Sequence, residues 1–291
     1  MEIANTDEYE AWNGDSGHRW VVDADRRDHI LAPVADTLLA AAQLAVGETV
    51  VDIGCGCGAT TVAAAQAVGP TGGVYGIDLS EPMLEVARRR ADVSGLSNTT
   101  FVQGDVQTHR FTGRGDVAIS RFGTMFFADE VAGLANIRGA LRPGGWLCIA
   151  TWRPLEANDW LTIPGAALLR YGTLPDTEAS GRGMFAQSDA ENVSRTLRAA
   201  GYADPVFQPV TLTLALGADS DEALDYLAGT GPGRAALDAV PEDQRSAALD
   251  AVRAALADHT QPEGVCLGAS IWMSRLATRP DTNWAADRRR Q

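Results

Sequence analysis

The stretch that most limits the fold is 49–61, which reads Thr-Val-Val-Asp-Ile-Gly-Cys-Gly-Cys-Gly-Ala-Thr-Thr. Its first five residues are mostly β-branched, as expected of a buried strand. Alternating glycines follow, and 59–68 is rich in small residues that favour a helix. Glycines between a buried strand and a helix allow a sharp turn and a close approach of a ligand to the backbone. Because a helix N-terminus presents unpaired N–H groups, this turn predicts a nucleotide-like cofactor over 54–58.

Two classes of cofactor fit this turn. Gly54, Gly56 and Ala59 match the dinucleotide pattern G-x-G-x-x-G/A. Asp52 argues against a dinucleotide, because a carboxylate near the turn would repel a diphosphate. A ligand with an ammonium group and no phosphate, such as S-adenosyl-L-methionine (SAM), would instead be attracted. The residues therefore favour SAM and leave NAD as the alternative.

Residues 52–58, Asp-Ile-Gly-Cys-Gly-Cys-Gly, resemble the first motif of class I SAM-dependent methyltransferases. Residues 141–146, Leu-Arg-Pro-Gly-Gly-Trp, resemble the lead into the fifth strand of that superfamily. The stretch 47–151 is similar to the broad type that includes ubiquinone/menaquinone C-methyltransferases and bacterial small-molecule methyltransferases of secondary metabolism. Trp12, Trp20 and the segment 120–127 look like a bacterial branch of that group. The resemblance implies SAM as the cofactor and S-adenosyl-L-homocysteine (SAH) as the product.

Two further acidic residues follow predicted strands. Asp78 ends the strand 73–78, about twenty residues beyond the glycines, where an acid suits ribose hydroxyls in SAM and NAD enzymes alike. The resemblance implies that Asp105 accepts from the adenine amino group, and Met83 is a candidate for the adenine face. The cofactor-binding residues expected on this basis are Asp52, Gly54, Cys55, Gly56, Gly58, Asp78, Leu79, Met83, Gly104, Asp105, Val106, Ser120 and Arg121.

The alternation of strands and helices predicts a parallel sheet with helices on both faces. With the resemblance, we expect an α/β fold with a doubly wound, mostly parallel seven-stranded sheet and a small N-terminal and inserted helical cap. Ligands bind such sheets at the carboxyl ends of the strands. Asp52, Asp78, Asp105 and Ser120 all fall at or near predicted strand ends, so we expect them to converge on one crevice.

We divide the chain into a leader and first helix (1–45), a SAM-binding core (46–153), a substrate cap with the last strands (154–277) and a tail (278–291). Residues 1–25 are expected to be irregular. A helix is expected over 26–44, kinked at Pro33 or starting there. Ser188 and Glu191 form an expected capping box at the start of a later helix.

Composition excludes several classes of function. The net charge of −14 disfavours nucleic acid and anionic membrane surfaces. All 24 basic residues are arginine, so the catalytic lysines of P-loop, kinase and pyridoxal-phosphate enzymes are absent. No apolar run suggests a membrane span, and the acidic stretch 1–10 does not resemble a signal peptide, so we expect a cytoplasmic protein. The four cysteines form no C-x-x-C pair, and no metal site is expected.

The SAM methyl group is already activated, so the protein mainly has to align a nucleophile and exclude water. A base is needed only when the nucleophile must lose a proton. His18, in the aromatic leader, is the candidate for that role, with an exposed loop histidine as the plainer interpretation. The aromatic leader and the apolar insertion predict a small, largely apolar acceptor. Candidate acceptor residues, each equally compatible with plain core packing, are Tyr9, Trp12, Phe122, Met125 and Trp152.

Two other functions stay open at this point. One is an NAD-dependent oxidoreductase, and the other is a non-catalytic SAM-fold protein that binds a ligand or partner. The expected partner is a small-molecule methyl acceptor, with no nucleic acid and no membrane. The sequence is compatible with a homodimer. It fixes neither the acceptor nor whether carbon, nitrogen or oxygen is methylated.

Overall fold

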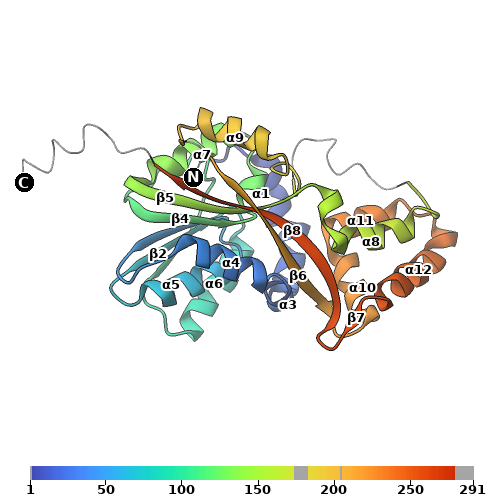
Figure 1. Cartoon of the computed structure of the whole chain (residues 1–291). Coiled ribbons are helices and arrows are strands. Elements are labelled where there is room, and N and C mark those ends of the chain that lie inside the picture. The colour runs from blue at the N-terminus through green and yellow to red at the C-terminus, as the bar shows by residue number, and fades with distance from the viewer. Residues whose placement is uncertain (1, 174–182, 204, 279–291) are drawn as a thin grey trace, which may run out of the picture.

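The structure is a computed structural model that describes residues 2–173, 183–203 and 205–278. Its centre is one mixed β-sheet with helices on both faces (Figure 1). The strands are β1 (Thr49–Ile53), β2 (Gly73–Asp78), β3 (Thr99–Gln103), β4 (Gly115–Arg121), β5 (Leu141–Trp152), β6 (Phe207–Gly217), β7 (Thr260–Gln261) and β8 (Gly264–Ala277). The α-helices are α1 (Thr6–Asn13), α2 (Asp15–Val22), α3 (Ala24–Ile30), α4 (Ala32–Ala42), α5 (Ala59–Val68), α6 (Glu81–Val93), α7 (Glu130–Gly139), α8 (Asp159–Leu168), α9 (Ala190–Ala199), α10 (Ser220–Gly229), α11 (Gly231–Asp238) and α12 (Arg245–Ala257).

The strand order is β3-β2-β1-β4-β5-β8-β6, and the short β7 pairs with β8 outside this path. The five strands from β3 to β5 run parallel, whereas β8 is antiparallel to both β5 and β6. The predicted doubly wound, mostly parallel sheet is confirmed, and β7 is an addition to the seven predicted strands. The strand order reverses between β1 and β4, which is where sheets of this kind bind ligands.

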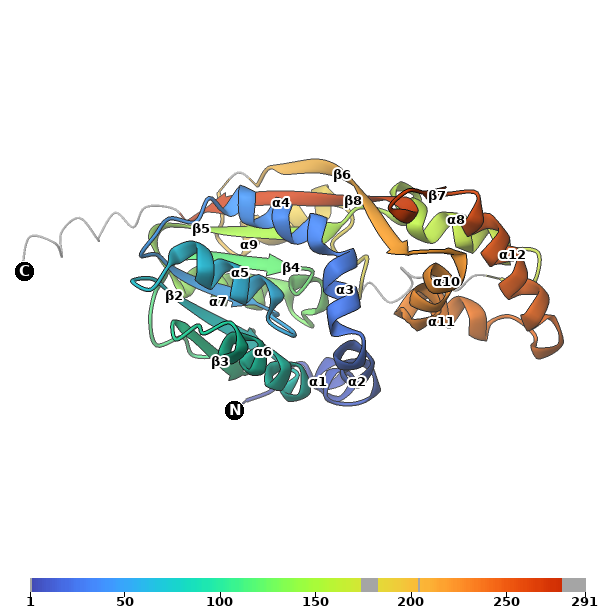
Figure 2. The same ribbon diagram turned by 90° about the horizontal axis from the view of Figure 1, so that it is seen from below.

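Alternation along the central strands builds a core on each face of the sheet, because successive side chains of a strand point to opposite faces. In β4, Val117 and Ile119 join the larger apolar cluster, whereas Ala118 joins the second. In β5, Cys148 likewise belongs to the larger cluster and Leu147 to the second. Helices α4, α5 and α6 cover one face, and α7 with α9 covers the other (Figures 1 and 2).

A second group of helices lies at one end of the sheet. The strands β6 and β8 extend beyond the parallel part and carry α8, α10, α11 and α12 at their far end (Figure 1). The first helices, α1 and α2, lie beside α6, and α3 leads from them to α4 (Figure 2). The carboxyl ends of the parallel strands therefore have the N-terminal helices on one side and this helical cap on the other.

Several predicted boundaries are confirmed. The strand β1 and the helix α5 have the expected limits. Gly58 precedes α5 with φ of 83°, a left-handed conformation that glycine adopts without strain. The Ser80 hydroxyl accepts from the Met83 amide at 3.4 Å and caps α6. Pro33 lies in the first turn of α4, so the alternative that the helix begins there is confirmed, and the residues before it form a separate helix, α3.

The expectation that residues 1–25 are irregular was wrong, because they form α1 and α2. Helix α1 buries none of its residues fully, so the sequence shows no apolar stripe there. Gly17 looks like a helix breaker, but a Cβ at this position would lie 1.8 Å from the carbonyl oxygen of Trp12. The N-cap of α9 is Asp189, whose carboxylate accepts from two amides, so the capping box expected at Ser188 and Glu191 was wrong.

The expected tail 278–291 lies outside the described residues apart from Thr278. In the described part of the chain, no helix combines the length and the apolar character needed to cross a bilayer. The same residues contain no cluster of three or more His, Cys, Asp or Glu side chains arranged to hold a metal ion.

Candidate functional site

One cavity of about 600 Å³ opens at the carboxyl ends of β1, β2 and β4. It brings together most of the residues expected from the sequence. The expected residues that line it are Trp12, Gly54, Cys55, Gly56, Asp78, Leu79, Met83, Gly104, Asp105, Val106, Arg121, Phe122, Met125 and Trp152. The expected residues that do not line it are Tyr9, His18, Asp52, Gly58 and Ser120.

The backbone amides of the glycine turn donate hydrogen bonds to other groups of the protein. The amides of Gly54 and Cys55 donate to the Ile77 carbonyl at 2.9 and 3.2 Å. The Gly56 amide donates to Asp78 Oδ2 at 2.8 Å. A diphosphate site needs such amides free to point at the ligand. The turn therefore fits a cofactor without phosphate better than a dinucleotide.

Asp78 presents a carboxylate to the cavity. Its Oδ2 accepts from the Gly56 amide and its Oδ1 from the Ser80 amide, both at 2.8 Å. Each oxygen keeps capacity for one more hydrogen bond. Burial raises the pKa of Asp78 to about 6, the nearby charge of Asp52 adds to this, and the amide hydrogen bonds oppose it. This arrangement suits an acceptor for two neighbouring hydroxyl groups.

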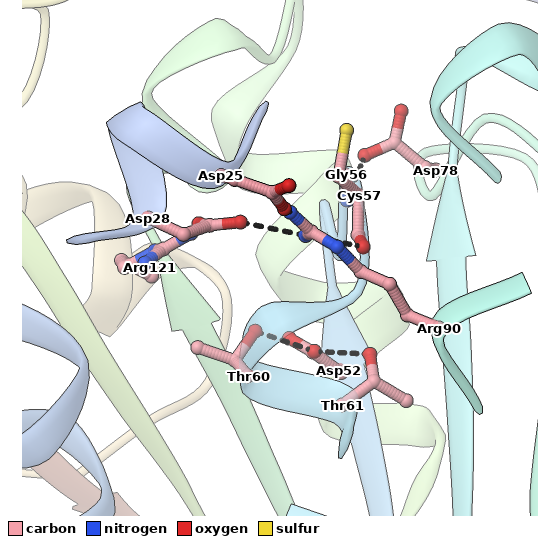
Figure 3. Close-up of polar contacts among 10 residues, drawn as sticks. All are labelled: Asp25, Asp28, Asp52, Gly56, Cys57, Thr60, Thr61, Asp78, Arg90 and Arg121. Atoms are coloured by element: carbon pink, nitrogen blue, oxygen red, sulfur yellow. Dashed lines mark hydrogen bonds and ion pairs between the residues drawn. The ribbon is translucent and has the colours of Figure 1, made fainter. Parts of the chain in front are cut away.

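Asp52 lies beneath the turn and not on the cavity wall. Its side chain is fully buried, and Oδ2 accepts from the Thr60 and Thr61 hydroxyls at 2.7 and 2.6 Å (Figure 3). Its Oδ1 has no hydrogen-bond partner. Burial raises the pKa of Asp52, while the two hydroxyls and the positive charge of Arg121 oppose that shift. The carboxylate therefore links β1 to α5. It does not line the cavity, so the expected direct attraction between Asp52 and the ammonium group of the cofactor has no geometric support.

Asp105 is engaged by the N-terminal segment. Its Oδ2 accepts from the amides of Ala4 and Asn5, each at 2.9 Å. Its Oδ1 accepts from the amide and the side-chain nitrogen of Gln107 at 2.9 and 3.0 Å. Four bonds fill the capacity of a carboxylate. An adenine amino group could bind Asp105 only by displacing one of these donors, so this role stays a prediction.

The N-terminal helices are fixed onto the β2–α6 junction. The Ser80 hydroxyl donates to the Trp12 carbonyl at 2.6 Å. The Asn13 side chain donates to the Leu79 carbonyl at 2.9 Å and accepts from the Glu81 amide at 3.1 Å. Because Leu79 and Trp12 both line the cavity, these contacts make the leader one of its walls.

A chain of ion pairs supports the turn from the other side (Figure 3). Arg121 at the end of β4 pairs with Asp28 of α3 at 2.6 Å. Asp28 also pairs with Arg90 of α6 at 2.7 Å, and Arg90 donates to the Cys57 carbonyl at 2.9 Å. Asp25 is a second partner of Arg90. The network links three elements to the backbone of the turn and fixes its position.

The far wall of the cavity is aromatic. Phe122 and Trp152 stack with ring centroids 4.2 Å apart and planes 10° from parallel. Trp160 packs on Trp152 at 5.3 Å. Phe122 has φ of 65°, an uncommon conformation for a bulky residue and one that is concentrated at functional sites. These rings form a flat apolar surface beside the glycine turn.

The candidate base and one candidate acceptor residue lie elsewhere. His18 is exposed on α2 and does not line the cavity. Tyr9 is half-buried on α1, where its carbonyl accepts from Asn13. Ser120 is fully buried, and its hydroxyl donates to the Ile53 carbonyl at 2.8 Å, which joins β4 to β1. Ser120 thus holds two strands together next to the cavity without lining it.

The cysteines near the turn are poor nucleophiles. Cys55 and Cys57 are free and buried. Burial raises the pKa of Cys57 to about 12, and burial likewise raises the pKa of Cys55. Since the thiolate is the reactive form, these side chains act as small packing groups.

Sequence reasoning missed the part of the cavity formed by distant helices. The missed lining residues include Arg19, Trp20, Arg27, Trp160, Phe185, Tyr226 and Arg234. They come from α2, α3, α8, the segment before α9, and α10 and α11. The signals for them were the aromatic leader, which contains Trp20, and the apolar character of the insertion after the fifth strand. No spacing in the sequence relates α3 to α11.

The sequence profile of a methyltransferase domain matches residues 44–197, more than half of the chain. Aklanonic acid methyltransferase DauC of Streptomyces sp. (strain C5) is 33% identical over 182 residues, which cover 59% of this chain and 82% of that protein. Demethylmenaquinone methyltransferase of Staphylococcus aureus (strain JH9) is 36% identical over 110 residues, but these cover 37% of this chain and only 45% of that protein.

Among solved structures, phosphoethanolamine N-methyltransferase 2 of Haemonchus contortus in complex with SAM aligns with a TM-score of 0.57. The alignment covers 96% of this chain and 61% of that one at 16% identity, so the likeness concerns the fold. The profile and the Streptomyces relative establish the family. The chain belongs to the methyltransferase domain family and is a SAM-dependent methyltransferase.

Proposed function

We propose that this enzyme transfers a methyl group from SAM to a small, largely apolar acceptor, a natural product or a quinone-like molecule. The observation that carries the proposal is the aromatic wall in the same cavity as the glycine turn, where Phe122 stacks on Trp152 and Trp160 packs against Trp152 at a tilt of 43°. A flat acceptor against these rings would bury its apolar faces. Two relatives are named for aklanonic acid and for demethylmenaquinone, which are small molecules.

The donors and acceptors on the cavity wall fit SAM. We assign Asp78 to the ribose hydroxyls, Met83 and Val106 to the adenine, and the 54–58 turn to the methionine portion. Arg121 keeps one guanidinium nitrogen, Nη1, without a partner, and we assign it to the carboxylate of the cofactor. At Gly56, a Cβ would lie 2.9 Å from Met83 Cε, so the absent side chain keeps this space open. When bound, SAM supplies a methyl group activated by its sulfonium.

The residues of this chain then have to bind, orient and exclude water. The leader, fixed by Ser80 and Asn13, covers the cofactor side of the cavity. The aromatic wall orients the acceptor, and an acceptor that fills the cavity against it displaces water from the reacting atoms. None of the four histidines of the sequence lines the cavity, so we propose an acceptor that needs no histidine to remove its proton.

Each part of the chain that we expected from the sequence has a proposed role. The core 46–153 holds the cofactor, and the leader 1–45 with the cap 154–277 closes over the acceptor. Helices α3, α8, α10 and α11 all contribute lining residues from outside the core. Cytoplasmic location, secondary metabolism and a homodimer stay predictions from the sequence.

His18 provides a test of the base-free mechanism. Because its ring is exposed on α2, we expect His18→Ala to change kcat and the SAH dissociation constant by less than about two-fold. Steady-state kinetics with calorimetric SAH binding measures both quantities. A fall in kcat of a hundred-fold or more with unchanged SAH binding would restore His18 as the base.

The proposed function is tested by binding and by transfer. Calorimetry is expected to show binding of SAM and SAH and none of NADH. Transfer of label from methyl-tritiated SAM into a cell extract of the producing organism is expected to yield a small, organic-extractable product. Heat-inactivated enzyme is the control. Label found only in protein or nucleic acid would contradict the acceptor class, and SAM binding without any transfer would favour the non-catalytic alternative.

A further inference from the structure

The unpaired polar atoms of the cavity are all hydrogen-bond donors. Among the described lining residues, four buried side-chain nitrogens have no partner: Arg27 Nε, Arg121 Nη1, Trp160 Nε1 and Arg234 Nη1. Trp160 is 3% exposed and Arg27 is 5% exposed. A buried N–H group left without an acceptor is costly. A ligand that fills this cavity is therefore expected to bring hydrogen-bond acceptors.

Arg27 is the most enclosed cation of the site. Its guanidinium lies 4.8 Å from the ring centroid of Trp20 and 5.8 Å from that of Tyr226. Its Nη2 donates to the Gly229 carbonyl at 3.2 Å. The carboxylate paired with it, on Asp23, stands 3.8 Å away, beyond hydrogen-bond distance. Arg27 is thus held in place by rings and a carbonyl, and its charge is only loosely compensated.

Arg234 brings a second cation from α11. Burial lowers the pKa of Arg234, and the positive charges of Arg19 and Arg27 lower it further. In the described part of the chain, no ion pair joins Arg234 to a carboxylate. Gly231 and Pro232, the first residues of α11, also line the cavity, so the positive end of the helix dipole faces the same space.

The acidic residues that line the cavity accept hydrogen bonds from groups other than these two arginines. Asp105 is saturated by the N-terminal amides and Gln107. Asp78 holds the amides of Gly56 and Ser80. Glu8 accepts from the indole nitrogen of Trp12. Asp15 and Asp238 oppose the positive charges around Arg234 without forming an ion pair with it in the described part of the chain, so its guanidinium keeps donors for a ligand.

We propose that Arg27 and Arg234 form an anion-binding subsite for the acceptor, and that the acceptor is an aromatic molecule bearing a carboxylate. A planar guanidinium matches the two oxygens of a carboxylate, and both arginines keep a buried nitrogen without a partner. The stacked rings of Phe122 and Trp152 take the aromatic body. This inference rests on the proposed function and specifies its substrate class.

The carboxylate of SAM is the competing anion for these donors. Arg121 is the arginine joined to the glycine turn, through Asp28, Arg90 and the Cys57 carbonyl. Arg27 instead donates to the Gly229 carbonyl of α10, and Arg234 belongs to α11. Both therefore lie on the side of the helical cap. This division assigns Arg121 to the cofactor and the other two to the acceptor, and binding measurements can separate the two roles.

The test compares two probes of one shape, 2-naphthoate and 2-naphthamide, by calorimetry on the full chain saturated with SAH. Wild type is expected to bind the naphthoate at least ten-fold more tightly than the naphthamide. Arg234→Gln should weaken naphthoate binding at least ten-fold and leave naphthamide and SAH binding within two-fold. Arg245→Gln, an exposed arginine of α12 outside the cavity, should change none of the three values.

Equal affinity of wild type for the two probes, or binding of neither, would overturn the subsite without any use of a variant. A loss of SAH affinity in Arg234→Gln with naphthoate binding intact would also overturn it, because the arginine would then serve the cofactor. SAH binding is measured first and separately. Failure of the cofactor site is therefore distinguishable from failure of the anion subsite.

Discussion

Asp78→Ala is expected to weaken SAH binding on the order of 10- to 100-fold, since charge-assisted hydrogen bonds to a ribose contribute roughly 1.5–3 kcal/mol. The Asp78 carboxylate lines the cavity and keeps capacity for two hydroxyl donors. The loss also frees the Gly56 amide, which loosens the turn in the same direction. Isothermal titration calorimetry with SAH measures the change.

The matched control is Asp92→Ala, an exposed acid on α6 that does not line the cavity. It removes the same charge and should leave the SAH dissociation constant unchanged. If Asp78→Ala binds SAH as tightly as Asp92→Ala does, then the ribose does not lie at the end of β2 and the cofactor assignment falls with it.

The same carboxylate predicts a pH dependence. The pKa of Asp78 in the folded state is about 6, raised by burial above its ordinary value of 3.8. Hydroxyl donors bind the ionised form, and with this pKa about one tenth of the carboxylate is ionised at pH 5, so SAH affinity should fall about ten-fold from pH 7 to pH 5. Asp78→Asn should bind weakly with no such slope.

A rise in pH has the opposite effect on the stability of the folded protein. Because the folded state binds this proton more tightly than the unfolded state does, ionisation of Asp78 costs stability, and that cost is complete above pH 6. The apo protein therefore loses this contribution as the pH rises, while the affinity for SAH increases. Denaturant titrations of wild type and Asp78→Asn at pH 5 and pH 7 separate the two effects.

Asp105→Ala is expected to release the N-terminal helices and to cost about 3 kcal/mol or more, because at least three backbone donors lose a buried acceptor. Two of those donors, the amides of Ala4 and Asn5, hold the start of the leader. Hydrogen exchange should accelerate at least ten-fold across α1, and thermal unfolding should report the loss of stability.

An ordinary helix N-cap serves as the comparison. Asp129 is exposed and accepts from the Ala132 amide at 2.9 Å at the start of α7. Asp129→Ala should cost only about 1 kcal/mol, as for other caps, and leave exchange in α1 unchanged. Unaltered exchange of α1 in Asp105→Ala would show that Asp105 is free to serve the adenine, as the sequence resemblance implies.

The parallel half of the sheet could be predicted because its signals are local. In β1 and α5, a β-branched run, a glycine turn and a small-residue helix follow one another within twenty residues. Residues that end parallel strands meet at one edge, so Asp78 and Asp105 could be placed in one cavity without coordinates. The helices α1 and α2 were not predicted because their contacts, such as the hydrogen bond from Ser80 to Trp12, join segments 68 residues apart.

The sequence by itself determined the fold class and the strand ends that surround the cavity, because short-range periodicity and turn chemistry specify those features. The cofactor followed from the resemblance of 52–58 to a methyltransferase motif, since the expected attraction of the cofactor to the charge of Asp52 was wrong. Only the tertiary structure decided that Asp52 lies beneath the turn, that Asp105 holds the leader, and that Arg27 and Arg234 share one cavity. The physical reason is that burial, hydrogen-bond saturation and the pairing of charges depend on which distant elements pack together. No spacing along the chain encodes these properties.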